Sequence, residues 1–232
     1  MHIKPVIDKY MSQVPEVKLY CRRCLQSERW DGNVILMIVD ASFDSIGLNY
    51  FHSVVPKVEY FRQQFIETNQ IITLEDLENT EYFKLQQIWK NRRSWHMAKS
   101  IASYLGYLKK DKNLNDKEAF LCWARSSQLE NWHLDPIGQI NGVGLTSYQY
   151  LRMMGGIDTV MPDKIVKRVI SNILSEANIK LPKSDLEFIY LMDDLARETG
   201  YRPIELCWMT WLIQSESNLA RMEKYSKILS KI

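Results

Sequence analysis

Apolar residues in this chain recur at three- and four-residue steps, and convincing two-residue alternation is absent. The first spacing places apolar side chains on one face of an α-helix, whereas alternation would place them on one face of a strand. Residues 34–39, VILMIV, form the one strand-like run, and it continues through Phe43 and Ile46 at helical steps. The pattern therefore predicts an all-α fold of roughly ten helices.

Glycine and proline, which interrupt helices, are sparse, with 9 and 7 copies, and they fall between the periodic segments. Thr73 and Ser184 each precede an acidic first turn, and Pro203 lies at the first turn of the last large helix. In that helix, Trp208 and Trp211 are expected to pack in the core. Helices are expected near residues 5–27, 34–46, 50–69, 74–79, 81–90, 92–110, 115–128, 144–155, 163–177, 184–199 and 203–218.

The composition indicates a globular protein, since 46% of the 232 residues are hydrophobic and can form a sizeable core. No apolar run approaches the ~18 residues that a membrane-spanning helix requires, and the first residues carry no stretch of the signal-peptide type. We therefore expect a soluble monomer without a membrane partner, located in the cytoplasm or associated with the nucleoid.

The cysteine pattern predicts no metal site. Cys21 and Cys24 form a lone Cys-x-x-Cys pair, and the four histidines are scattered along the chain. A zinc ribbon or an iron–sulfur cluster needs further thiolates or paired histidines at ligand spacing. We therefore expect reduced thiols and no bound metal.

The net charge is only +2, but positive residues are concentrated between Lys90 and Lys112. This segment holds seven basic residues, among them Arg92 and Arg93, and one acid, Asp111. Such a segment can follow a phosphate backbone, or it can be the solvated face of a helix. The sequence leaves both interpretations open.

Residues 140–144, Ile-Asn-Gly-Val-Gly, place two glycines immediately before a helical segment. Glycine permits positive φ and a close approach to the backbone, and the N–H groups at a helix N-terminus can hold a phosphate oxygen. Gly142, Val143 and Gly144 are therefore candidates for gripping a nucleic-acid backbone independently of base sequence. The same pattern also occurs in ordinary turns.

Asp163 lies nineteen positions after Gly144, in the run Met-Pro-Asp-Lys-Ile-Val-Lys-Arg-Val of residues 161–169. The glycine hairpin, this spacing and the helix after the acid cover about thirty residues. Together they resemble the helix-hairpin-helix DNA glycosylase superfamily, which includes endonuclease III, the adenine-mismatch glycosylase and the 3-methyladenine glycosylases. A weaker resemblance extends upstream over residues 35–61 and 89–105.

The resemblance implies two helical domains with a cleft between them. Residues 33–152 would form a helical barrel ending in the helix-hairpin-helix, and residues 1–32 plus 153–232 would form the second domain. The implied activity is base-excision repair, in which a damaged or mismatched base is flipped out of double-stranded DNA and its N-glycosidic bond is hydrolysed with Asp163 as the catalytic carboxylate. No cofactor is required, apart from a monovalent cation that the hairpin could hold. The implied DNA contacts are Gly142, Val143, Gly144, Thr146, Lys164, Lys167, Arg92 and Arg93, and the implied base pocket consists of Phe43, Tyr50, Trp95 and His96.

The chain departs from the family pattern at informative positions. Thr146 stands where bifunctional members carry a lysine that forms a Schiff base with the sugar, so we expect a monofunctional enzyme that uses water and has little lyase activity. Asn141 replaces the usual proline of the hairpin, and Ser42 stands near the usual glutamine of the early helix, where we identify no second catalytic carboxylate. Cys207 is the one C-terminal cysteine, which excludes the four-cysteine iron–sulfur cluster.

Asp163 admits two compatible interpretations. A catalytic carboxylate would stabilise the positive charge of an oxocarbenium-like sugar and orient water, whereas a helix N-cap would only begin a helix. The helix N-terminus is expected to lower the pKa of Asp163 and keep it ionised. Two other classes remain open: a helix-hairpin-helix protein that binds DNA without catalysis, and an all-α interaction protein unrelated to DNA. The sequence does not encode which base would be released.

Overall fold

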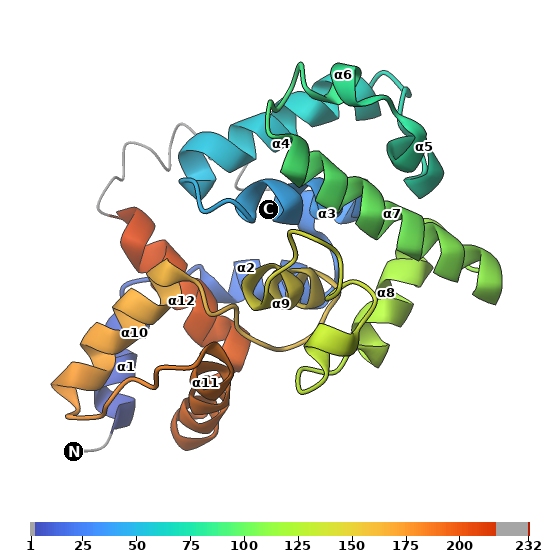
Figure 1. Cartoon of the computed structure of the whole chain (residues 1–232). Helices are drawn as coiled ribbons and strands as arrows, with labels where there is room; N and C mark the ends of the chain where they lie inside the picture. The colour runs from blue at the N-terminus through green and yellow to red at the C-terminus, as the bar shows by residue number, and fades with distance from the viewer. Residues whose placement is uncertain (1–2, 217–231) are drawn as a thin grey trace.

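The computed structural model describes the chain from Ile3 to Glu216, together with Ile232, and these residues form helices, turns and loops without a strand. The all-α prediction is therefore confirmed (Figure 1). The α-helices are α1 (Ile3–Met11), α2 (Val17–Leu25), α3 (Val34–Asp44), α4 (Val55–Phe61), α5 (Leu74–Asn79), α6 (Tyr82–Leu85), α7 (Arg92–Lys112), α8 (Asp116–Ser126), α9 (Leu145–Met154), α10 (Lys164–Glu176), α11 (Asp185–Thr199) and α12 (Pro203–Glu216). Short 3₁₀ turns cover Arg29–Gly32 and Trp132–Leu134, and π-helical turns cover Tyr50–Val54 and Arg62–Ile66.

Most observed helices follow the predicted positions, but the helix predicted at 81–90 is shorter, since α6 ends at Leu85 and turns follow it. The capping boxes at the starts of α5 and α11, where Thr73 and Ser184 accept backbone N–H groups, are present as expected. The predicted helix 5–27 is instead two helices, because the chain turns between α1 and α2 around Pro15. Residues 217 and 218 of the last predicted helix, like residues 217–231 of the predicted second domain, lie outside the described part of the chain.

Helix α3 forms the centre of the fold. Ten consecutive residues, Val34–Phe43, are buried, because α4, α7, α8 and α9 all pack against this helix. A helix that is apolar on every side needs neighbours on every side, which explains why the strand-like run is helical here. Asp44, the last residue of α3, is half-buried, so the carboxyl group of this residue lies at the edge of the core.

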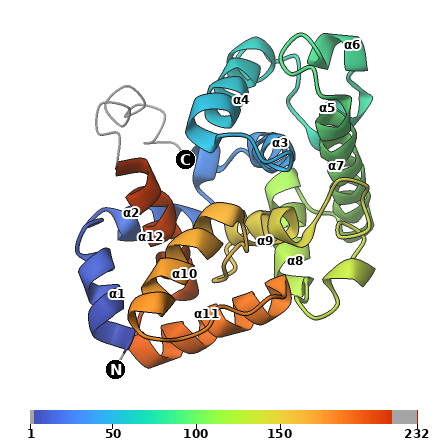
Figure 2. The same cartoon turned by 60° about the vertical axis from the view of Figure 1, so that its left-hand side comes forward.

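The N-terminal and C-terminal helices lie side by side although they are far apart in sequence (Figure 2). Helix α1 contacts α10, α11 and α12, and α2 contacts α12 and α9. On the other side, α3–α8 form a second group, with α9 between the two groups (Figure 1). The division into two domains at the predicted ranges stays a prediction. None of the described helices is both long and apolar enough to cross a membrane.

Side-chain hydrogen bonds connect the extended chain between α9 and α10 to the neighbouring helices. Gln149 on α9 donates to the Thr159 hydroxyl at 2.6 Å and to the Val160 carbonyl at 3.0 Å. The Asp158 carboxylate accepts the backbone N–H of Ile204 at 3.1 Å, at the start of α12. These bonds fix the backbone immediately before α10 begins.

Candidate active site

Asp163 is the N-cap of α10, and its Oδ1 accepts the backbone N–H of Val166 at 2.6 Å. Burial raises the pKa of this carboxyl from 3.8 to about 6, against the opposing effect of backbone hydrogen bonds and of Lys167 and Arg168. The expected lowering of the pKa is therefore wrong, because desolvation outweighs the helix N-terminus. The group remains mostly ionised at neutral pH.

Asp163 lines an open cleft of about 870 Å³, counting the solvent at its mouth. The cleft lies between the end of α3 and the starts of α9 and α10. Three of the residues expected to contact DNA, Thr146, Lys164 and Lys167, line it as well. The structure therefore brings the start of the hairpin helix and the distant acid to one surface.

A second carboxyl group, Asp44, lines the same cleft. Its pKa is raised from 3.8 to about 8, first by burial and then by the negative charges of Asp40 and Asp163, while Arg29 opposes the increase. At neutral pH, Asp44 is therefore mostly protonated while Asp163 is mostly ionised, a division typical of acid–base pairs. Ser42, near the position of the family's glutamine, is buried and donates to the Ile38 carbonyl at 2.7 Å, outside the cleft.

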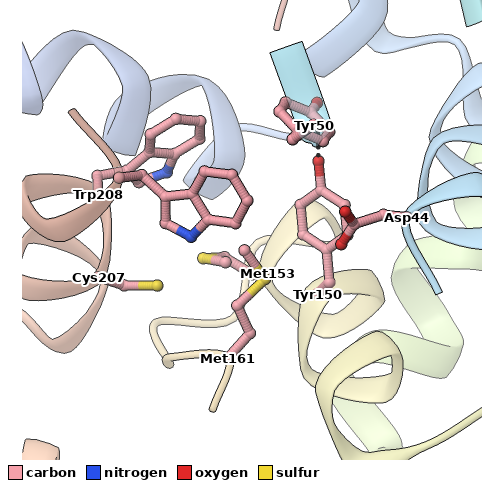
Figure 3. Close-up of a pocket in the computed structure, with 8 residues that line it drawn as sticks. Asp44, Tyr50, Tyr150, Met153, Met161, Cys207 and Trp208 are labelled. Carbon is pink, nitrogen blue, oxygen red and sulfur yellow. Dashed lines mark hydrogen bonds between the residues drawn. The ribbon is translucent and has the colours of Figure 1, made fainter. Parts of the chain in front are cut away.

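A narrow pocket, of about 310 Å³ when the open solvent beside it is counted, adjoins the cleft and shares Asp44 and Trp211 with it. Its walls are rings and sulfur-bearing side chains, and the space between them has room for about one water molecule. Besides the two shared residues, the pocket is lined by Tyr50, Tyr150, Met153, Met161, Cys207 and Trp208 (Figure 3).

The structure corrects the expected base pocket, because Tyr50 lines the observed pocket and the other three residues do not. Phe43 and Trp95 are core residues: Phe43 stacks on Trp89 with ring centroids 4.5 Å apart and meets Trp95 edge-on at 4.8 Å. His96 is exposed on α7. Successive residues of a helix point about 100° apart, so Phe43 faces the core while its neighbour at position 44 reaches the cleft.

Trp208 and Trp211 are buried, as expected, and they also form one wall of the pocket. Trp211 meets Tyr50 edge-on at 5.4 Å, and Tyr20 stacks on Trp208 at 5.0 Å. The pocket therefore joins α12, from the C-terminal part of the chain, to the π-helical turn after α3.

A fully buried ion pair lies behind the pocket. Arg29 Nη2 is 3.0 Å from Asp40 Oδ2, and neither side chain has exposed surface. The same guanidinium nitrogen donates to the hydroxyls of Tyr50 and Tyr150 at 2.6 and 2.7 Å, and both hydroxyls lie within 3.0 Å of Asp40 Oδ2. The tyrosine hydroxyls are thus bound outside the pocket, and their rings are left to form its wall.

The glycine hairpin has the geometry that its sequence requires. Gly142 adopts φ 107°, and Val143, which is buried, donates its N–H to the Ile140 carbonyl at 2.9 Å. Gly144 is the exposed N-cap of α9, and a Cβ built there would meet nothing within 4 Å. The chain before the hairpin forms the turn Trp132–Leu134 and further turns in place of an α-helix, so a complete helix-hairpin-helix stays a prediction.

The basic segment at the start of α7 divides into two parts. Arg93 is exposed beside the hairpin, with its Nε 3.6 Å from where a Cβ on Gly142 would lie. Arg92 is exposed as well, and its guanidinium lies over the Tyr82 ring at 5.0 Å. Farther along the helix, Lys109 forms ion pairs with two acids of neighbouring helices. Within this basic segment, the positive charge beside the hairpin therefore lies in the first turn of α7.

The two lysines of the cleft differ in their surroundings. Lys164 is exposed at the start of α10, whereas Lys167 Nζ is 2.6 Å from Asp185 Oδ1. An ion pair exposed to this degree is weak and can exchange for a phosphate. Both lysines can thus act as phosphate contacts at the mouth of the cleft.

The four cysteines are free thiols, three of them buried. Burial raises the pKa of the Cys207 thiol in the pocket, so the group is protonated and unreactive. Between Ile3 and Glu216, no three His, Cys, Asp or Glu side chains come close enough together to hold a metal ion.

Comparison of the chain with models of known protein families finds no match. No curated protein matches its sequence, and no solved structure matches its fold. The cleft and the pocket therefore carry the functional inference.

Proposed function

We propose that this chain is a monofunctional DNA glycosylase, which hydrolyses the N-glycosidic bond of a damaged or mismatched base flipped out of double-stranded DNA. The observation that supports the proposal most is the position of Asp163, a carboxylate in an open cleft beside the start of the hairpin helix and near an aromatic pocket. An extruded nucleotide needs an acid at its sugar, a grip on its backbone and a pocket for its base.

In this proposal Asp163 acts on the sugar. Breaking the bond between C1′ and the base leaves positive charge on the sugar, and an ionised carboxylate stabilises this charge and orients the attacking water. The hydrogen bond from Val166 holds the carboxylate in one orientation. Thr146 offers no amine, so water supplies the new bond to C1′.

The aromatic pocket would receive the base. Stacking on aromatic side chains contributes about 1–3 kcal/mol per base and tolerates different bases. The walls must separate to admit a ring, and the thioether side chains of Met153 and Met161 are flexible enough to move aside.

The hairpin and the nearby cations would hold the DNA backbone. Gly144 leaves the N-terminus of α9 open to a phosphate oxygen. Arg93, Lys164 and Lys167 surround this approach with positive charge. Binding through phosphates would weaken steeply as salt concentration rises, which separates the proposal from an interaction protein unrelated to DNA.

The test is release of free base from a panel of duplexes that carry alkylated, oxidised, deaminated or mismatched bases. The wild-type chain should release at least one base, and Asp163→Asn should slow release by about 10³-fold. Asparagine is an equally good N-cap, so this variant should keep its fold and its DNA affinity. If Asp163 were only a cap, Asp163→Asn would release base at the wild-type rate.

Two further outcomes are informative. Salt-dependent DNA binding without release of any base would identify a helix-hairpin-helix protein that binds DNA without catalysis. Efficient covalent trapping of the wild-type chain on DNA by borohydride would show an amine nucleophile and would contradict the monofunctional assignment.

A further inference from the structure

The Asp44 carboxyl stands at the junction of the cleft and the aromatic pocket, and it lines both. Among the side chains of residues 3–213, none forms a hydrogen bond or an ion pair with this carboxyl. It is also the last residue of a helix that is otherwise buried, which fixes the place from which the side chain projects. A polar group held in such a place without a partner among the described side chains is available to a ligand.

The charges around Asp44 keep its proton in place. Asp40 lies one helical turn before it on α3, and Asp163 approaches from the start of α10. Arg29 is the nearby positive charge, and it is already paired with Asp40. The phenols of Tyr50 and Tyr150 are neutral, since burial raises the pKa of each well above its ordinary value. The carboxyl is therefore desolvated by burial and also meets two negative charges, and it is mostly neutral at neutral pH.

The rest of the pocket offers no group that readily gives up a proton at neutral pH. The hydroxyls of Tyr50 and Tyr150 are bound to Arg29 and Asp40 behind the wall. The remaining wall consists of two thioethers, the Cys207 thiol and two indole rings, whose N–H groups can donate a hydrogen bond but cannot transfer a proton at neutral pH. Asp44 is therefore the group of this lining that is placed to transfer a proton to a base.

We propose that the base released by this chain is neutral in DNA, and that Asp44 is the general acid that protonates it as it leaves; this inference rests on the proposed function. The bond between C1′ and the base nitrogen breaks, and its electron pair stays with the base. The Asp44 O–H proton is transferred to the base, and the hydroxide part of a water molecule is added to C1′. The remaining proton of that water goes to Asp163, which then releases it to the solvent in the cleft, and the solvent returns a proton to Asp44.

A base that is already cationic, such as an N7-alkylated purine, leaves without receiving a proton, so a protonated carboxyl would not assist it. Two rings of the wall already interact with a buried cation. The Arg29 guanidinium lies over the rings of Tyr150 and Trp208, 5.4 and 5.3 Å from their centroids, and it is not part of the pocket lining. Rings that already face one cation attract a second one less strongly.

The experiment compares single-turnover release of neutral bases, such as uracil, hypoxanthine and 8-oxoguanine, with release of cationic 7-methylguanine, by the wild-type chain and by Asp44→Asn. We expect release of at least one neutral base, and a loss of about 100-fold or more for that base in the variant. For 7-methylguanine we expect slow release that changes by less than about threefold, because its departure needs no proton. A merely structural role of Asp44 would slow both kinds of release equally.

Two results would overturn the inference while leaving the proposed function standing: preferential release of 7-methylguanine, or release of a neutral base by Asp44→Asn at the wild-type rate. Failure to release any base, with folding confirmed by thermal unfolding, would overturn the proposed function and the inference with it. The matched variant Asp163→Asn should slow the release of neutral and of cationic bases alike, since the sugar becomes positive in both cases.

Discussion

Replacing Asp44 by asparagine should stabilise the folded protein, and the gain should grow with pH. The pKa of Asp44 is about 8 in the folded chain and near 3.8 when the chain is unfolded. A carboxyl whose pKa is raised by folding stabilises the fold fully below its unfolded pKa, and this contribution is lost as the pH rises through its folded pKa. The free energy of unfolding of the wild-type chain should therefore decrease between pH 4 and 8. The variant cannot ionise at this position, so it should not show this part of the decrease.

At about 1.4 kcal/mol per pH unit, the full shift sets an upper limit of about 6 kcal/mol. The side chain is half-buried and keeps some contact with solvent, so we expect about half of this, ~3 kcal/mol, at pH 8.5 and ~1 kcal/mol at pH 5. Urea unfolding followed by the fluorescence of the seven tryptophans measures both values.

Asp185→Asn is the matched control, because it removes a carboxylate from the same cleft but one that is exposed and paired with Lys167. It should change the free energy of unfolding by less than about 1 kcal/mol, in the destabilising direction. A gain for Asp44→Asn that is constant with pH, or a loss of stability at pH 8.5, would refute the reasoning. This result is independent of what the protein does.

The remaining predictions concern the cleft and the hairpin. The rate of base release should be bell-shaped in pH, falling below about 6 as Asp163 is protonated and above about 8 as Asp44 ionises; a flat profile would contradict these roles. Gly142→Ala should lower the free energy of unfolding by about 1 kcal/mol because of its φ of 107°, whereas Gly144→Ala, with φ −103° and open space, should spare stability and weaken DNA binding. Equal losses of stability in the two variants would contradict this account. Thr146→Lys should gain a borohydride-trapped DNA complex that the wild-type chain lacks, and its absence would mean that this position does not reach the sugar.

Local patterns were sufficient to predict the helices. Caps such as Thr73 and Ser184 act within four residues, so their effect can be read from neighbouring letters. The VILMIV run was the hardest case, and its continuation at helical steps indicated a helix correctly. The spacing of apolar residues could not predict how α12 packs against the turn that begins at Tyr50. That contact joins parts of the chain that are far apart in sequence.

The pocket and its charges depend on such distant contacts. Trp211 was expected in the core, and it is buried, yet its place beside Tyr50 also makes it a wall. The expected pKa of Asp163 had the wrong sign because sequence shows the helix start but not the depth of burial. The sequence contains one signal for Asp44, because this acid directly follows the largely apolar segment 34–43, which is buried in the structure. An acid at the end of a buried helix has to reach a surface or be neutralised.

Helix α3 has a consequence for how the chain must be handled. Its VILMIV segment is β-prone, uncharged and free of proline, which are the properties of segments that assemble into cross-β fibrils when exposed. In the native protein this segment is protected because the neighbouring helices enclose it completely. We therefore expect refolding yield to decrease as protein concentration rises, since aggregation at this segment competes with the packing of the helices that cover it.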